Sequence, residues 1–200
     1  GKGHVGIVVI ADTKTGKAAL KIRRLDADRK GMHHEAEMLA KANTLGIGPR
    51  LIGNDDDFLL MEFLAGQLLP DWIAGLKGRN IRKRIRDVLL DILEKCYKLD
   101  QAGLDHGELS RAPKHVIVNA LDKPNLVDFE TASVTRKTSN VTSMVQYLFM
   151  KSQLAKAMYR KLGRIDQEML LATLRGYKQR STRKNFDTIL ETCKLIKRQA

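Results

Sequence analysis

The residues best suited to chemistry begin at the first position. GKGHVGIV places Gly1, Gly3 and Gly6 in the spacing G-x-G-x-x-G, which lets backbone amides approach phosphates closely. The following letters, IVVIA, DTKTGK and AALKI, predict a strand, a turn and a second strand. A dinucleotide-binding unit would need a helix there, and a Walker-type loop would need G-K-[ST]. The pattern therefore predicts a glycine-rich flap over nucleotide phosphates that includes Val8, although an ordinary glycine-containing hairpin would give similar letters.

A buried ion pair is the next expected feature. Lys21 lies in AALKI, which resembles the V-A-I-K strand of protein kinases, whose lysine holds the nucleotide phosphates. Residues 32–46, MHHEAEMLAKANTLG, predict a helix that ends at Gly46. Helical periodicity puts Glu35 within the apolar face of this helix and Glu37 on the opposite side. Because a carboxylate among apolar side chains is costly unless paired, we expect Glu35 to bind Lys21; a solvated strand lysine is the alternative.

Two further segments carry candidate residues. Residues 58–63 predict a buried strand, followed by a turn at Gly66, which resembles the kinase hinge but equally fits a core strand leaving its sheet. Residues 80–103 have the apolar spacing of a long amphipathic helix. This helix leads into HGELSRAPKHVIV and then NLVDFE, for which we expect a hairpin of two strands with Asp128 at the end of the second.

The order of flap, strand lysine, helix glutamate, hinge, HGEL and DFE resembles the protein-kinase fold in a minimal form. The resemblance covers residues 1–132 and is greatest to the atypical Rio-type kinases, the kinase subunit of the tRNA-threonylcarbamoylation (KEOPS) complex and, above all, the predicted archaeal Ser/Thr kinases. It implies an α+β, minimal bilobal fold. The expected N-lobe, residues 1–64, has an antiparallel sheet, and the expected C-lobe, residues 65–200, is small and helical.

The resemblance also implies an activity and a set of site residues. We expect an ATP-dependent phosphotransferase, an atypical Ser/Thr protein kinase or an ATPase, that uses ATP with Mg²⁺ or Mn²⁺. Its substrate would be a protein Ser/Thr hydroxyl, including its own. The implied catalytic residues are Glu108, Lys21 and Glu35, and the implied metal ligands are Asp128 and His115. The implied nucleotide-binding residues are Gly1, Gly3, Gly6, Val8, Lys21, Met61 as gatekeeper, and Glu62 and Leu64 as backbone partners of adenine.

Three positions depart from the family pattern. Glu108 replaces the H-G-D aspartate with a side chain one methylene longer. A longer loop brings His115 to the place of the metal-binding asparagine, although Mg²⁺ prefers oxygen ligands. Glu130 replaces the glycine after Asp128, as in small-molecule phosphotransferases of the aminoglycoside and choline type. These departures leave two alternatives: a nucleotide-binding pseudokinase that serves as an RNA- or RNP-associated module, and a small-molecule phosphotransferase.

Composition limits the setting and the partners. The net charge of +13 favours an anionic partner such as nucleotide or RNA, and RKRIR, RGYKQRSTRK and KLIKR are either patches for it or solvated helix faces. Only two cysteines, no bilayer-spanning apolar run and no signal peptide favour a cytoplasmic protein without a membrane partner.

Since the chain does not begin with Met, we allow for an N-terminal segment before residue 1. After the DFE motif, which no A-P-E follows, we expect helices over 141–163, 166–179 and 184–199.

The remaining histidines have simpler expected roles. His106, within HGEL, is expected to be a hydrogen-bonded core residue that braces its loop. His33 and His34 are expected to be solvated residues of the predicted helix over 32–46.

Overall fold

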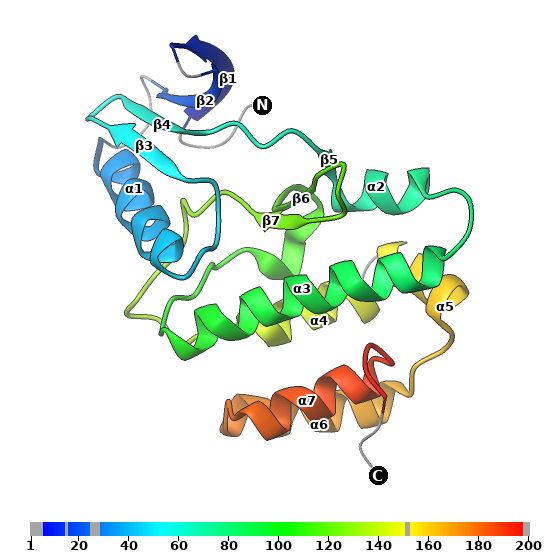
Figure 1. The fold of residues 1–200 in the computed structure, drawn as a ribbon. Coiled ribbons are helices and arrows are strands. Elements are labelled where there is room, and N and C mark those ends of the chain that lie inside the picture. The colour runs from blue at the N-terminus through cyan, green and yellow to red at the C-terminus, as the bar shows by residue number, and fades with distance from the viewer. Residues whose placement is uncertain (1–5, 15, 25–28, 151–152, 198–200) are drawn as a thin grey trace.

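A four-stranded antiparallel sheet with one helix against it forms one part of the molecule (Figure 1). The computed structural model describes residues 6–14, 16–24, 29–150 and 153–197. The sheet has the order β1-β2-β4-β3. Its elements are β1 (Gly6–Thr13), β2 (Gly16–Arg23), α1 (Arg29–Thr44), β3 (Leu51–Asn54) and β4 (Phe58–Glu62).

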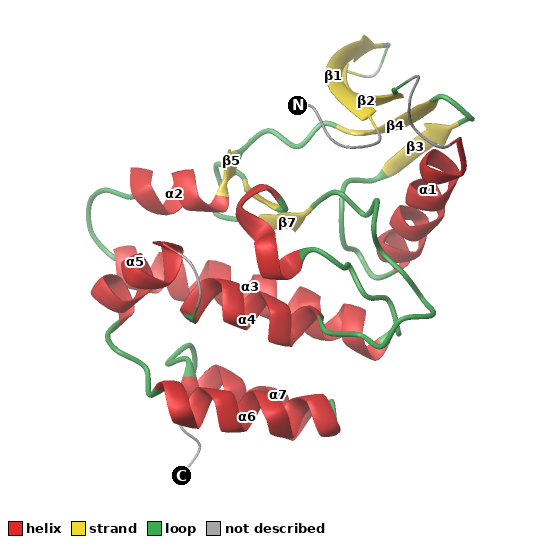
Figure 2. Cartoon of the chain, turned by 180° about the vertical axis from the view of Figure 1, so that it is seen from behind, coloured by secondary structure: helices red, strands yellow, loops and turns green. Residues whose placement is uncertain are grey.

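The second part is mainly helical and holds a small three-stranded sheet of order β5-β6-β7. Figure 2 shows α3 and α4 side by side beneath this sheet, with α6 and α7 packed at the end far from the four-stranded sheet. The fold is therefore α+β with a small bilobal arrangement, as predicted, while the boundary between residues 64 and 65 stays a prediction. Its elements are β5 (Gln67–Leu68), α2 (Leu69–Gly75), α3 (Ile81–Gln101), η1 (Leu109–Lys114), β6 (Val116–Val118), β7 (Pro124–Leu126), α4 (Asn140–Phe149), α5 (Gln153–Leu162), α6 (Gln167–Gln179) and α7 (Arg183–Thr192).

Apolar spacing explains the two longest helices. The predicted inner face of α1 is buried, including Met32, Ala36 and Leu39. The predicted apolar stripe of α3 is likewise buried from Ile85 to Leu99 and belongs to the main core. Burial of such stripes is the main source of helix stability in a folded protein. None of the helices in the described ranges has the length and apolar character needed to cross a membrane.

The C-terminal helices differ from the prediction in number. The single helix predicted over 141–163 is wrong, because the chain forms α4 and α5 instead. Met150, directly after α4, has φ −126° and ψ −57°, outside the α-helical range, and so ends that helix. The predictions over 166–179 and 184–199 correspond to α6 and to a shorter α7. Lys194 has φ 58°, a left-handed conformation that an α-helix cannot continue through.

A buried polar network joins three helices to the loop that carries HGEL. Asp100, in the last turn of α3, accepts hydrogen bonds from the Asn140 backbone N at 2.9 Å, from Asn140 Nδ2 at 2.8 Å and from the Tyr177 hydroxyl of α6 at 2.9 Å. Asn140 Oδ1 accepts the backbone N–H of His106 at 2.8 Å, and Asn140 Nδ2 also donates to the Leu104 carbonyl. Because these groups are buried, each would lose both its partner and its access to water if the network were cut.

We therefore expect Asn140→Ala to destabilise the fold by about 1–3 kcal/mol, since it leaves the His106 N–H, the Leu104 carbonyl and part of Asp100 unpaired. Denaturant unfolding measures this free energy. Asn54→Ala, in which the side chain is exposed at the end of β3, is the matched control and should cost less than about 0.5 kcal/mol. Equal losses in the two variants would contradict the role of the network.

Candidate active site

A single lysine ammonium joins the two parts of the fold. Lys21 lies on β2, and its Nζ contacts Glu35 Oε2 of α1 at 2.5 Å. The same Nζ contacts Glu130 Oε2 at 2.9 Å and Asp128 Oδ1 at 3.4 Å, both from the segment after β7. The predicted pairing of Lys21 with Glu35 is confirmed, whereas Glu37 is exposed and pairs with Lys41. The catalytic roles of Lys21 and Glu35 stay predictions.

Burial and the neighbouring charges together shift the pKa values of Lys21 and Glu35. Burial alone would lower the pKa of Lys21, but the Glu35 and Asp128 carboxylates hold it above its usual range. Burial raises the pKa of Glu35 to about 7, with Asp128 and Glu130 adding to the rise and Lys21 opposing it. Three carboxylates therefore contact the one ammonium of Lys21.

A cleft of about 410 Å³ opens beside this cluster. Every predicted nucleotide-binding residue from Gly6 onward lines it, and the set is Gly6, Val8, Lys21, Met61, Glu62 and Leu64. Gly1 and Gly3 lie outside the described residues. A Cβ on Gly6 would lie 2.8 Å from the Ile22 carbonyl oxygen and 2.9 Å from Lys21 Cγ, so this position has no room for a side chain. The cleft has an apolar wall and one charged end, a combination that suits a ligand with a flat ring and a charged tail.

The strand predicted as a hinge is β4, which enters the cleft at its C-terminal end. Met61 pairs with Ala19 of β2, and the backbone N–H of Glu62 donates to the Arg50 carbonyl at 2.9 Å. Among the described residues, the backbone N–H of Leu64 makes no backbone hydrogen bond. This amide is therefore available to a ligand in the cleft.

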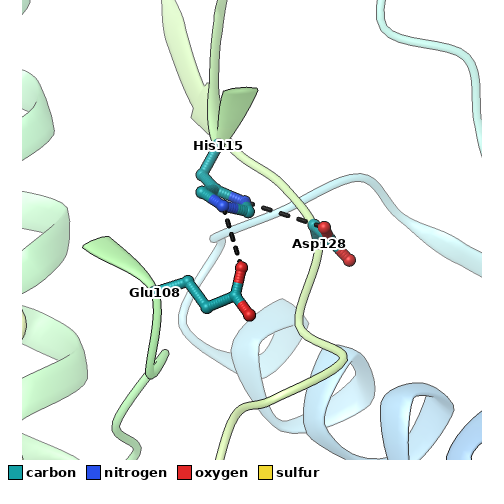
Figure 3. Close-up of side chains that lie close together, drawn as sticks. All are labelled: Glu108, His115 and Asp128. Atoms are coloured by element: carbon teal, nitrogen blue, oxygen red, sulfur yellow. Dashed lines mark ion pairs between the residues drawn. The ribbon is translucent and has the colours of Figure 1, made fainter. Parts of the chain in front are cut away.

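The second cluster consists of Glu108, His115 and Asp128, which Figure 3 shows converging from the two ends of the HGEL-to-HVIV loop and from the segment after β7. His115 Nε2 lies 3.1 Å from Glu108 Oε2, and His115 Nδ1 lies 3.7 Å from Asp128 Oδ2. The His115 side chain is only 8% exposed, whereas those of Glu108 and Asp128 are 42% and 41% exposed. Within the described ranges, His115 Nδ1 is buried without a hydrogen-bond partner.

The backbone around these side chains is tightly constrained. Gly107 has φ 92°, and a Cβ there would lie 2.6 to 2.8 Å from atoms of Arg136 and Thr131, so HGEL requires its glycine. Asp128 has φ 70°, which is uncommon for a residue other than glycine and is enriched at functional positions. It lies beyond the end of β7 at Leu126, so the prediction that it ends the strand is wrong by two positions. The left-handed conformation of Asp128 is incompatible with a continued strand.

The other histidines differ in their surroundings. His106 is fully buried, and its Nε2 lies 3.1 Å from the Val127 carbonyl, to which it donates. Burial, with the nearby His115 ring, lowers the pKa of His106 to about 4, so the ring is neutral at pH 7. Its Nδ1 has no partner in the described part of the chain, so the predicted core residue is hydrogen-bonded at one nitrogen only. His33 and His34 are exposed, as predicted, and contact Asp56 and the Ala132 carbonyl.

The carboxylates suit a magnesium ion better than the imidazole does. Glu35, Asp128 and Glu130 each offer an oxygen within 4.8 Å of the others, the hard-ligand chemistry that Mg²⁺ prefers. Asp128 therefore fits its predicted part as a magnesium ligand, and His115 does not. Glu130 was absent from the predicted site residues. The signal for it was a second carboxylate two residues after Asp128 in VDFE.

A larger hollow of about 720 Å³ lies elsewhere, between α2, η1 and α5. Its lining is mostly apolar and includes Ile73 and Leu154, together with the basic residues Arg160 and Lys161. Neither group of described residues with metal-ligand geometry lies in it. The smaller cleft beside Lys21 is therefore the candidate active site.

Comparison with known proteins finds two partial similarities. The chain is 30% identical over 131 residues to the serine/threonine-protein kinase YabT of Bacillus subtilis, a match that spans 59% of this chain and 36% of YabT. It is also 30% identical over 103 residues to the uncharacterized protein MJ1211 of Methanocaldococcus jannaschii, which spans 52% of this chain and 84% of that protein. The chain belongs to the same family as MJ1211. No family model matches the chain, and the finer resemblance to Rio-type and KEOPS kinases stays a prediction.

The raised pKa of Glu35 predicts a pH dependence of stability. Its ordinary value is 4.5 and its native value is about 7, so the native chain binds more protons here than the unfolded chain between these values. The contribution of Glu35 to the free energy of unfolding is therefore greatest at acidic pH and falls as pH rises through about 7. We expect the stability of the wild type, relative to Glu35→Gln, to decrease from about pH 5 to about pH 8 in urea unfolding.

Glu37→Gln is the control for this measurement. Glu37 is exposed on the same helix, and its hydrogen bond to Lys41 lowers its pKa, so it stays ionised across the same pH range. This variant should follow the pH dependence of the wild type. A wild type and Glu35→Gln pair with parallel curves would contradict the raised pKa of Glu35.

Proposed function

We propose that the chain is an ATP-dependent phosphotransferase of the serine/threonine protein kinase type. The observation that carries this proposal is Lys21, buried and paired with Glu35, at the end of a cleft that Asp128 also lines. A lysine held by a helix carboxylate opposite a metal-binding aspartate is the arrangement that protein kinases use to position nucleotide phosphates. The partial similarity to a serine/threonine kinase supports the same class.

Different residues of the cleft would bind the adenine and the phosphates of the nucleotide. Val8 and Ala19 offer apolar contact on one face of the adenine, and the Glu62 carbonyl and the Leu64 amide would pair with its edge. The β1–β2 hairpin, which begins at Gly6, would cover the phosphates. Lys21 would bind them once Glu130 releases its Nζ, while Glu35 keeps the ammonium in place.

The carboxylates opposite Lys21 would bind the metal ion and position the acceptor hydroxyl. Asp128 and Glu130 would hold Mg²⁺ or Mn²⁺, which screens the phosphate charge when bound. Glu108 would accept a hydrogen bond from the acceptor hydroxyl and orient it toward the γ-phosphate. His115, 3.1 Å from Glu108, would limit the motion of the longer glutamate side chain. The acceptor is proposed to be a protein Ser/Thr hydroxyl.

Two observations favour a second candidate, a nucleotide-binding module without phosphoryl transfer. Glu130 Oε2 lies 2.9 Å from Lys21 Nζ and so occupies the ammonium that phosphates would need. His115 stands where an oxygen ligand would suit magnesium better. The small-molecule phosphotransferase and the RNA partner expected from the charge stay predictions. The next two experiments separate transfer from binding alone.

Nucleotide with a divalent cation should raise the melting temperature. Binding to the native state alone adds about 2.7 kcal/mol to the free energy of unfolding when the ligand is at 100 times its Kd. Lys21→Met should lose most of this gain, because it removes the phosphate-binding ammonium. Lys17→Met, exposed on the same strand, should keep it. Thermal unfolding of each variant with and without ATP gives the comparison, and no shift for the wild type at millimolar ATP would refute every nucleotide-binding proposal.

Variants of Glu108 and Asp128 test phosphoryl transfer separately from nucleotide binding. Glu108→Gln keeps the size of the side chain and removes its charge, so turnover should fall by roughly 10²–10⁴ while nucleotide affinity stays near that of the wild type. Asp128→Asn should weaken both, because it removes a cation-binding charge. The assay follows phosphate release and protein labelling from γ-labelled ATP, with Glu37→Gln as the exposed control. An active wild type whose rate survives Glu108→Gln would exclude Glu108 as the base.

A further inference from the structure

The hollow of about 720 Å³ beside α5 has no part in the proposed phosphoryl transfer. Helices α2 and α5 both line it, and Figure 2 shows α2 above α5 at one side of the molecule. Aliphatic side chains and prolines make up most of the lining, and Arg160 and Lys161 of α5 add two positive charges. The volume lies within the range of roughly 300–1,000 Å³ that is typical of ligand-binding sites.

The positive charge of α5 is not balanced by acidic neighbours on the same helix. Its sequence, QLAKAMYRKL, contains no Asp or Glu. Its three basic residues, and Arg164 just beyond its end, form no ion pair within the described ranges. Lysines of α1 and α3, in contrast, pair with carboxylates four residues away. The basic residues of α5 are therefore open to an anionic partner.

A second hollow, of about 460 Å³, lies against α5 and is mainly basic. Its lining consists of Lys156, Arg160 and Arg164 together with Gln153 and Tyr159. Gln153 and Arg160 line both hollows, so the two adjoin along the helix. A ligand that spans α5 would therefore place an apolar group in the larger hollow and anionic groups in the smaller one.

We propose that this surface binds an acidic segment of a partner protein. A large apolar side chain of the segment would occupy the hollow between α2 and α5, and neighbouring Asp or Glu side chains would contact Arg160 and Lys161. Such a ligand matches both the apolar lining and the unbalanced positive charge. The proposal rests on α5 and its two hollows and does not depend on the proposed phosphotransferase activity.

Two other anionic partners match only part of this surface. Nucleic acid would use the charges, but its bases stack on aromatic side chains, and Tyr147 is the one aromatic residue in the lining of the larger hollow. A membrane surface would need apolar side chains that project outward into the lipid. Ile73 and Leu154 are instead only 2% and 8% exposed, so they form the wall of a hollow.

The docking surface adjoins the candidate active site. Pro113 of η1 lines the larger hollow, and the next residue, Lys114, lines the cleft beside Lys21. The same segment begins directly after Glu108 and ends directly before His115. A protein bound at α5 would therefore be held one short segment away from the cleft.

Selection from a phage-displayed library of random short peptides, on the wild-type chain without nucleotide, tests the proposal. We expect enrichment of Asp and Glu around one or two large apolar residues. Fluorescence anisotropy of a labelled, selected peptide then gives its Kd. Arg160→Glu combined with Lys161→Glu should raise this Kd at least about tenfold, because two attractions become repulsions. Ala74→Asp should also raise it, because Ala74 is exposed and lines the larger hollow.

Two control variants make the same chemical changes away from this surface. Arg180→Glu combined with Lys184→Glu alters the net charge equally, at the turn between α6 and α7 that Figure 1 shows far from α5. Ala172→Asp adds a carboxylate at an exposed position of α6. Both controls should keep the Kd within about twofold of the wild-type value at physiological salt, where distant charges are screened.

Several outcomes would overturn the proposal: no enrichment, selected peptides without acidic residues, a Kd that survives the charge reversal at α5, or equal losses in the control variants. Single-stranded RNA and vesicles that contain phosphatidylserine are measured in the same way. If the charge reversal removes binding of either one and not of peptides, the surface serves that partner and the proposal is wrong. Peptide binding without ATP turnover would keep the docking surface and remove the phosphotransferase, whereas turnover without peptide binding would do the reverse.

Discussion

The two parts of the fold meet at the ammonium of Lys21, which contacts carboxylates from both. An isolated buried cation is very costly, so Lys21 must be accompanied by carboxylates wherever it is buried. Its partners come from α1 and from the segment after β7, far apart in the sequence. The strand, the helix and the second part of the molecule therefore meet at one point, and the cleft beside that point depends on their meeting.

The same contacts give the site a charge opposite to that of the whole chain. The sequence has a net charge of +13, yet the side chains around the end of the cleft include Glu35, Asp128, Glu130 and Glu108 against the single ammonium of Lys21. A polyphosphate cannot enter such a site without added positive charge, because like charges at short range in a poorly hydrated place repel strongly. We therefore expect an anionic ligand to bind here together with a cation.

The sequence predicted those features of the site that depend on residues close together in the chain. The choice of Glu35 over Glu37 follows from helical periodicity and the cost of burying an unpaired carboxylate, and α3 follows from its apolar stripe. The contact of Glu130 with Lys21 could not be predicted in this way, since it depends on how the segment after β7 approaches β2. The break at Met150 was missed because apolar residues continue on both sides of it. The network of Asp100 and Asn140 joins residues whose types alone give no signal of contact.

Asp128 links the two carboxylate clusters, and this sharing has a physical consequence. Its Oδ1 contacts Lys21 at 3.4 Å and its Oδ2 faces His115 at 3.7 Å, so one carboxylate belongs to both groups. Its left-handed backbone conformation limits how far it can move toward either. A shift of this carboxylate toward Lys21 would lengthen its distance to His115, and a shift toward His115 would lengthen its distance to Lys21. The position of Asp128 therefore couples the electrostatics of the two clusters.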